Sequence, residues 1–152
     1  MFRIALLLLP FILRNASADP NFPLKSAEVN GKMAIVDSDN NRVKLACVNW
    51  YGFHIEEMVV NGLDRRPLGE IADDIKAMGF NCVRLVYAIE TVYSNTFVPM
   101  WRISENPELF GLKPIEIYDV VVEALTSRGV MVILNNHVSL RLLLSVCRIK
   151  TP

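Results

Sequence analysis

The sequence has no excess of charge of either sign. Its 152 residues carry 16 Lys and Arg side chains against 16 Asp and Glu side chains, and no stretch gathers the basic ones into a patch. Proteins that bind nucleic acid present a basic surface to the phosphate backbone. The charge balance therefore argues against a nucleic-acid partner.

Long apolar runs are absent after the amino terminus. The run at residues 4–13 has 10 residues, whereas a helix needs about 20 to span a bilayer. It follows the basic Arg3 and precedes Ala16-Ser17-Ala18, a small-residue cleavage site. We predict a signal peptide over residues 1–18, a secreted, extracellular protein, and no membrane partner after cleavage. A buried amino-terminal helix is the alternative, but Pro10 would interrupt it.

Two kinds of site lack the residues that they need. No glycine-rich phosphate loop follows the first predicted strand, which argues against a doubly wound nucleotide-binding sheet. We also expect no cofactor and no metal site. The three cysteines, Cys47, Cys82 and Cys147, are an odd number for an exported chain. Because Cys47 and Cys82 fall in predicted buried strands, we interpret them as thiols of the core.

The first structured part of the chain is predicted to be a β-hairpin. Its two candidate strands are residues 28–33 and residues 34–37. The stretch at residues 38–41 is rich in Asn and Asp, which tolerate the left-handed backbone conformations of tight turns.

The rest of the chain predicts strands that alternate with helices. Three largely apolar stretches predict core strands, at residues 42–50, 81–87 and 130–134. Two stretches between them carry apolar side chains at helical period. Each opens with a proline and ends at a glycine, Pro67 to Gly79 and Pro114 to Gly129. This order is typical of a parallel sheet with right-handed crossovers.

Polar and aromatic side chains gather near the end of each predicted core strand. They are Asn49 and Trp50, then Arg84 and Tyr87, then Asn136 and His137. Arg84 interrupts an apolar strand, and an unpaired buried charge is very costly. It is therefore either half of a structural ion pair or part of an active site at the carboxyl end of a parallel strand.

Polar groups at successive strand ends are what a (β/α)₈ barrel presents at its active face. We therefore predict an α/β fold that is a partial TIM barrel, with its first three strands and two helices after an amino-terminal hairpin. A complete barrel takes about 250 residues, so this chain holds only part of one.

Three stretches of the sequence resemble glycoside hydrolase family 5, the cellulase family, over about residues 26–139. They are VNWYGFHIEEMVVNGLDRR, IKAMGFNCVRLVY and LKPIEIYDVVVEALTSRGVMVILNNHVS. The resemblance implies a secreted, retaining, endoglucanase-like O-glycosyl hydrolase that breaks down a β-linked polysaccharide of the β-glucan or mannan type.

The resemblance also implies roles for single residues. Arg84 would support the nucleophilic carboxylate, and an arginine fork can hold such a group ionised and oriented. His137 would line the sugar site nearest the cleaved bond, with Asn136 as a further binding or supporting group. Trp50 and Tyr87 would lie near the cleft, since aromatic faces pack on the apolar faces of pyranose rings.

Neither catalytic glutamate of the family is expected in this chain. In the family they follow the fourth and seventh strands, and the sequence reaches only the third. Residues 19–139 are thus predicted to be a partial catalytic domain, and residues 140–152 a divergent tail. We predict a truncated form that is inactive alone. A non-catalytic sugar-binding or inert secreted remnant is the alternative.

Three residues of the first loop are weaker candidates. Glu56 and Glu57 are adjacent in a predicted loop, and the family takes its acids from elsewhere, so we do not expect them to be catalytic. His54 is predicted to lie at the surface or at the rim of the cleft.

Overall fold

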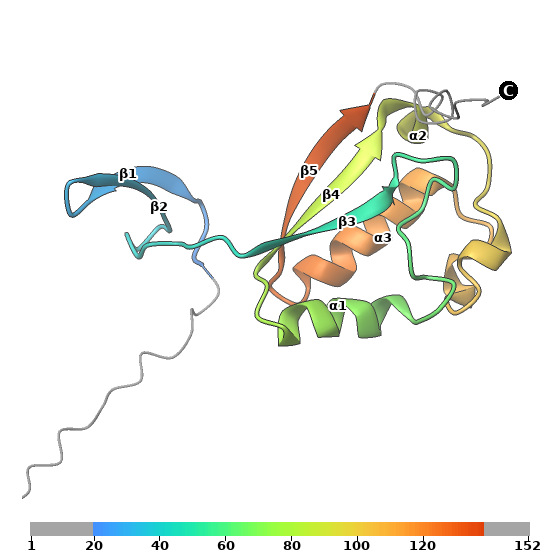
Figure 1. Ribbon diagram of the computed structural model, residues 1–152, viewed down its shortest axis with the longest axis horizontal. Helices are drawn as coiled ribbons and strands as arrows, with labels where there is room; N and C mark the ends of the chain where they lie inside the picture. The colour runs from blue at the N-terminus through green and yellow to red at the C-terminus, as the bar shows by residue number, and fades with distance from the viewer. Residues whose placement is uncertain (1–19, 139–152) are drawn as a thin grey trace, which may run out of the picture. The chain divides into compact units, whose positions relative to one another are not determined.

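The computed structural model describes residues 20–138, so the predicted signal peptide and the predicted tail at residues 140–152 lie outside the described residues. The chain divides into two units, one ending at Lys44 and the other beginning at Leu45 (Figure 1). Within the described part, no helix has the length and apolar character needed to cross a membrane.

The first unit contains the predicted hairpin, but its turn lies elsewhere. Strands β1 (Lys25–Val29) and β2 (Lys32–Val36) pair antiparallel. The turn between them is Asn30-Gly31, where φ is 52° and 75°. Asn-Gly is a preferred pair for a two-residue hairpin turn because both positions need positive φ. The Asn-rich stretch at residues 38–41 instead forms a separate turn after β2, so the predicted strand positions are wrong.

The second unit is built on a three-stranded parallel sheet. Its strands are β3 (Cys47–Phe53), β4 (Cys82–Ala88) and β5 (Met131–Val138), in the order β3-β4-β5. The predicted alternation of strands and helices is confirmed. The first and third strands differ from the prediction, because β3 begins five residues later than expected and β5 continues through the polar stretch at residues 135–137.

Two helices pack on one face of this sheet, as the apolar stripes predict. They are α1 (Leu68–Ala77) and α3 (Pro114–Thr126), and Figure 1 shows both on the same side of the strands. Val83 and Leu85 of β4 belong to the buried core that these helices close. The remaining core residues include Ala72, Ile75, Ile117, Val121 and Leu125.

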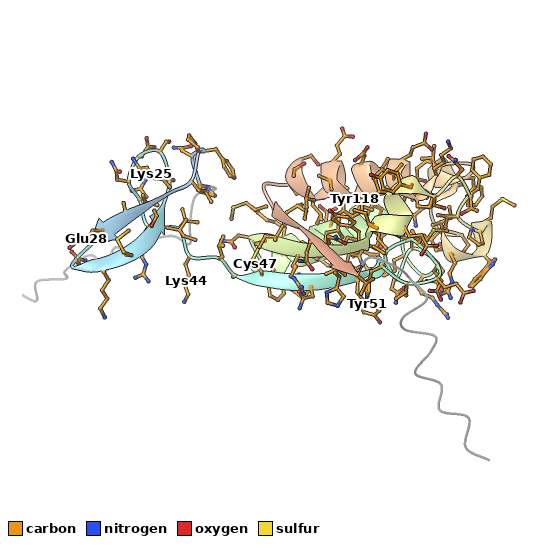
Figure 2. The ribbon with its side chains drawn as sticks, turned by 90° about the horizontal axis from the view of Figure 1, so that it is seen from above. Lys25, Glu28, Lys44, Cys47, Tyr51 and Tyr118 are labelled. Atoms are coloured by element: carbon orange, nitrogen blue, oxygen red, sulfur yellow. A yellow bond between two sulfur atoms is a disulfide. The ribbon has the colours of Figure 1, made fainter. Side chains whose placement is uncertain are left out.

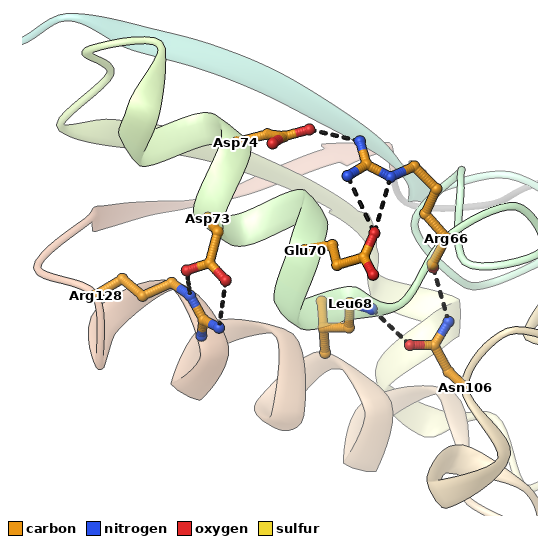
Figure 3. A network of polar contacts seen from close by, with 7 residues as sticks. All are labelled: Arg66, Leu68, Glu70, Asp73, Asp74, Asn106 and Arg128. Carbon is orange, nitrogen blue, oxygen red and sulfur yellow. Dashed lines mark hydrogen bonds and ion pairs between the residues drawn. The ribbon is translucent and has the colours of Figure 1, made fainter.

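The long loop after β4 is ordered by short helices and by one buried side chain. It contains α2 (Ile89–Tyr93) and two 3₁₀ turns, η1 (Met100–Arg102) and η2 (Pro107–Leu109). The Asn106 carboxamide accepts a hydrogen bond from the N–H of Leu68 at 2.6 Å and donates to the carbonyls of Leu63 at 2.8 Å and Arg66 at 3.1 Å. Asn106 thus joins this loop to the start of α1 (Figure 3).

Ion pairs add to this arrangement on the outer side of α1. Arg66 contacts Glu70 and Asp74, and Arg128 contacts Asp73 through two nitrogen–oxygen pairs (Figure 3). The Arg128 hydrogen bonds hold the pKa of Asp73 below its usual value. All five side chains are partly exposed, and exposed pairs contribute only a few tenths of a kcal/mol to about 1 kcal/mol each.

Cys47 and Cys82 form a disulfide, which corrects their interpretation as core thiols. They are Cα partners on the adjacent parallel strands β3 and β4, with the Cα atoms 4.3 Å apart. Partners on neighbouring strands point to the same face of a sheet, which brings the two sulfur atoms together. The disulfide therefore joins the first two core strands at their amino-terminal ends, where Figure 2 labels Cys47.

Candidate functional site

Arg84 lies in the middle of the central strand, on the face opposite α1 and α3. Asn49 of β3 is its Cα partner on one side. Asn135 of β5 lies on the same face, because it pairs with Val86, two residues further along β4. The guanidinium donates to Oδ1 of Asn135 at 2.8 Å and to Oδ1 of Asn49 at 3.3 Å. One residue from each strand thus forms the centre of this face.

These contacts do not neutralise the charge of Arg84. Both partners are neutral amides, and no carboxylate within residues 20–138 forms an ion pair with it. A guanidinium has five N–H donors arranged to fit a carboxylate. The structural ion pair considered as one interpretation is therefore not formed within the described part of the chain. The two asparagines fix the side chain while leaving its charge available to an anion.

Two histidines lie at the carboxyl ends of the outer strands. His137 of β5 and His54, which follows β3, have ring centroids 5.2 Å apart and nearly perpendicular planes. Tyr51 extends the group, with its ring centroid 6.4 Å from that of His54. Tyr51 is exposed (Figure 2). Of these three residues, His137 is the one that was predicted from the sequence to bind substrate.

His54 is buried rather than at the surface or the rim as expected. Only 9% of it is exposed, and its Nδ1 atom has no hydrogen-bond partner within the described residues. Burial, followed by the positive charge that His137 can carry, lowers the pKa of His54. Its imidazole is therefore held in the neutral form more strongly than that of a solvated histidine.

Three of the predicted site residues lie on the other face of the sheet. Trp50 is buried in the helix-covered core, and its indole N–H donates to the Asn61 carbonyl at 2.9 Å. Tyr87 contacts Tyr118 of α3, with ring centroids 5.7 Å apart. Asn136 is the Cα partner of Tyr87. The structure thus brings Arg84 together with Asn49 and Asn135, and does not bring Trp50, Tyr87 or Asn136 to that face.

Tyr87 and Tyr118 instead line a small cavity of about 210 Å³, whose walls come from β4, β5, α2 and α3. Tyr118 donates to the Leu85 carbonyl at 3.3 Å, and burial raises the pKa of its hydroxyl. This tyrosine pair is part of the packing of the sheet on α3, where the aromatic rings meet edge to face.

Glu56 and Glu57 of the first loop line a hollow together with Arg102. Glu57 forms an ion pair with Arg102 of the loop after β4. Residues 20–138 contain no group of three His, Cys, Asp or Glu side chains that could hold a metal ion. On the Arg84 face, the chemistry available is therefore that of a fixed positive charge beside amides, imidazoles and a phenol.

Comparison with known proteins gives consistent matches to one family. The family model for cellulase (glycosyl hydrolase family 5) matches residues 35–147. A glycosyl hydrolase 5 family protein of Chamaecyparis obtusa is 40% identical over 151 residues, covering 89% of this chain and 27% of that protein. The major extracellular endoglucanase of Xanthomonas campestris is 33% identical over 115 residues, covering 76% of this chain and 24% of that protein.

Solved structures give the same result. The catalytic domain of the Xanthomonas campestris major endoglucanase aligns with a TM-score of 0.66 and 32% identity, over 71% of this chain and 31% of that domain. An endocellulase from Pyrococcus horikoshii in complex with cellotetraose aligns with a TM-score of 0.63 and 26% identity, over 76% of this chain and 32% of that one. The chain spans about a quarter to a third of the length of these proteins. It belongs to glycosyl hydrolase family 5.

Proposed function

We propose that this chain supplies the first three strands of the (β/α)₈ barrel of a secreted, retaining, endoglucanase-like glycosidase that acts on a β-linked polysaccharide. The observation that carries the proposal is the state of Arg84. It is held by Asn49 and Asn135 and has no carboxylate partner within the described residues. A guanidinium that is already oriented can bind a carboxylate from another part of the barrel.

The chemistry of a retaining glycosidase assigns a role to this charge. Such an enzyme uses two carboxyl groups about 5–5.5 Å apart, one as nucleophile and one as acid/base. The nucleophile must be ionised and aimed at the anomeric carbon. The guanidinium of Arg84 would favour the ionised form and orient it through a forked pair of hydrogen bonds.

The histidines would act on the sugar rather than on the bond. A neutral imidazole donates from one nitrogen and accepts at the other, so it can bind a sugar hydroxyl in either sense. We assign His137 to the sugar site nearest the cleaved bond, where it meets His54 edge to face. Arg84 and His137 cannot replace an acid and a nucleophile, so we propose that residues 1–152 alone do not hydrolyse polysaccharide.

A hybrid enzyme tests the role of Arg84. Residues 45–138 replace the matching segment of the Xanthomonas campestris catalytic domain, and reducing-sugar release from carboxymethyl cellulose is measured. We expect the hybrid to be active. Arg84→Ala should lower kcat by about 10²-fold or more, as when a fixed electrostatic group is removed from an active site. Arg65→Ala is the matched control, because that side chain is 83% exposed and pairs with its neighbour Asp64.

The competing outcomes are distinct. A folded, active hybrid in which Arg84→Ala and Arg65→Ala behave alike would show that Arg84 is structural. Activity of the 152-residue chain by itself, lost in Glu56→Gln or Glu57→Gln, would show that the catalytic acids lie in the first loop.

Secretion is proposed on two grounds, the leader-like sequence and the name of the extracellular Xanthomonas campestris relative. Expression in a eukaryotic secretory host should give material that begins at Asp19. Amino-terminal sequencing of the medium and of the cells decides this, and an intact Met1 form confined to the cells would contradict it.

A further inference from the structure

An irregularity in each outer strand of the sheet lies beside the contact between His54 and His137. Strand β3 has one residue more than β4 between the paired positions that end at Phe53 and Tyr87. Strand β5 has one residue more than β4 directly after the Tyr87 pairing, and that additional residue is His137. Bulges of this kind change the direction of a side chain and are common next to active sites. Both bulges lie beside Tyr87, at the carboxyl end of the central strand.

The two histidines reach each other from strands that are not neighbours. Figure 1 shows β4 between β3 and β5, and neighbouring strands are about 4.8 Å apart, so the outer strands are about 10 Å apart. The ring centroids of His54 and His137 are nevertheless only 5.2 Å apart, with an angle of 85° between the ring planes. Aromatic rings attract one another in this edge-to-face arrangement. A ring contact therefore links the two outer strands across β4.

His54 is the fixed member of this pair. Only 9% of it is exposed. The backbone before it is held because the Phe53 carbonyl accepts a hydrogen bond from the hydroxyl of Thr91, a buried residue of α2. The backbone after it is held because the Ile55 N–H donates to the Gly52 carbonyl at 3.2 Å. A buried ring on a bonded backbone has little freedom to change its rotamer.

His137 is the member whose orientation depends on the contact. It is exposed and is the last residue but one of β5. Its side chain forms no hydrogen bond or ion pair with any residue between 20 and 138, so no polar partner among them fixes the imidazole. A mobile side chain loses rotamer freedom when it binds a ligand, and this loss weakens binding. A ring that already restrains His137 removes part of that cost.

The charges of the two rings are compatible with this contact. Burial, followed by the positive charge that His137 can carry, lowers the pKa of His54. The buried ring therefore stays neutral when His137 is protonated, and two positive charges do not face each other.

We propose that His54 is a positioning residue, which holds the exposed imidazole of His137 in one orientation toward the sugar. The inference rests on the proposed function, because the sugar contact of His137 is part of it. It adds a residue of the loop after β3 to the support of a group on β5. It predicts that position 54 needs a planar ring, and that a side chain of similar bulk without a ring is not sufficient.

NMR of the imidazoles tests the contact directly. The sequence has two histidines, so a substitution at His54 leaves His137 as the only imidazole in the spectrum. The unaltered 152-residue chain should show a nuclear Overhauser contact between the two rings. His54→Leu fills the buried volume without a ring, so the signals of His137 should move to those of a solvated histidine. His54→Phe keeps a ring and should hold them away from the solvated values.

Calorimetric titration with cellotetraose gives the functional readout. His54→Leu should weaken binding by about three- to tenfold, as for one hydrogen bond whose donor is no longer held in place, and His54→Phe by less than about twofold. Val59→Ala is the matched control, because Val59 is buried in the same loop and belongs to the core beneath the helices. It should lower the urea midpoint while leaving the His137 signals and cellotetraose binding unchanged.

The positioning role has outcomes that overturn it. If His54→Leu leaves the His137 signals unchanged, or if Val59→Ala displaces them equally, His54 does not orient His137. If His54→Phe behaves like His54→Leu, a ring at this position is not what holds the imidazole.

Failure of the positioning role and failure of the proposed function give different results. If His137→Ala weakens cellotetraose binding but His54→Leu does not, the proposed function stands and the positioning role is overturned. If His54→Leu displaces the His137 signals but His137→Ala binds cellotetraose as tightly as the unaltered chain, His54 orients His137 and the proposed sugar contact is overturned.

Discussion

The two faces of the sheet are built from alternate residues of the same strands, yet they differ in kind. On β4, Val83 and Leu85 enter the core beneath α1 and α3. Arg84, between them, faces the other side of the sheet and donates to the amides of Asn49 and Asn135. On the helix-covered face, Val83 and Leu85 of β4 are fully buried among apolar side chains. The Arg84 face holds a charge that the described residues leave without an opposite charge. The first face therefore forms the core, and the second carries polar groups and a charge.

We expect the largest loss of stability from a substitution in the core beneath the helices. Leu85→Ala should lower the free energy of unfolding by about 2–5 kcal/mol, because it removes a fully buried side chain and leaves a cavity. Asn49→Ala, on the Arg84 face, should change it by only about 0.5 kcal/mol, as for an exposed substitution. Urea titration measures both. Equal losses would show that the two faces do not differ in this way.

Removing the disulfide tests whether this covalent bond stabilises the two strands that carry Asn49 and Arg84. Cys47 and Cys82 lie two residues before Asn49 and Arg84, on the same face and at a sequence separation of 35. Replacing both by serine should lower the free energy of unfolding by about 2–4 kcal/mol through loss of this constraint. The background for both proteins is Cys147→Ser, which excludes exchange with the third thiol. No change in the urea midpoint would mean that packing alone holds the two strands.

Asn106 is a buried polar side chain that hydrogen-bonds the backbone near the start of α1. Asn106→Ala should lower the free energy of unfolding by about 1–3 kcal/mol, since it leaves buried backbone groups of Leu63, Arg66 and Leu68 without partners. Asn95→Ala, in the same loop but exposed, is the control and should have little effect. If the two variants unfolded at the same midpoint, Asn106 would not be what fixes the loop.

The smallest effect concerns pH and the histidine pair. The pKa of His54 is lower in the folded state than in the unfolded state, so the unfolded chain binds more protons as the pH falls through the normal histidine range. Stability should therefore be complete above that range and decline below it. His54→Gln should reduce the loss of stability between pH 7.5 and pH 5.5, measured by urea unfolding. An unchanged pH dependence would show that burial of His54 carries no titration.

Local signals in the sequence located the helices well. Pro67 and Gly79, and Pro114 and Gly129, set the limits of the two helices that the structure has as α1 and α3. The hairpin prediction was wrong because the Asn-rich stretch at residues 38–41 has the composition of a turn, whereas the hairpin turn itself is the shorter pair Asn30-Gly31. The hairpin turn is set by two residues that adopt positive φ, and the Asn-rich composition of the four residues at 38–41 does not decide its position.

The site was predicted only in part, because it depends on register. Arg84 and His137 were visible as polar residues at strand ends. That Asn49 and Asn135, rather than Asn136, meet Arg84 follows from which residues face which side, and a shift of one residue reverses the face. The family resemblance implied that Trp50 and Tyr87 lie near the cleft, whereas alternation along the strands places both side chains with the core. His54 gave no local signal, since its burial comes from the fold around it.

Side-chain NMR of the 152-residue chain tests the difference between the two faces most directly. Signals from the Arg84 guanidinium and from the Asn49 and Asn135 carboxamides report the Arg84 face, and the Asn106 carboxamide reports the covered region. On titration with cellotetraose, the first group should shift and Asn106 should not. Shifts confined to Asn106 and to the helices, with the Arg84 group unchanged, would contradict the assignment of the Arg84 face as the sugar-binding face.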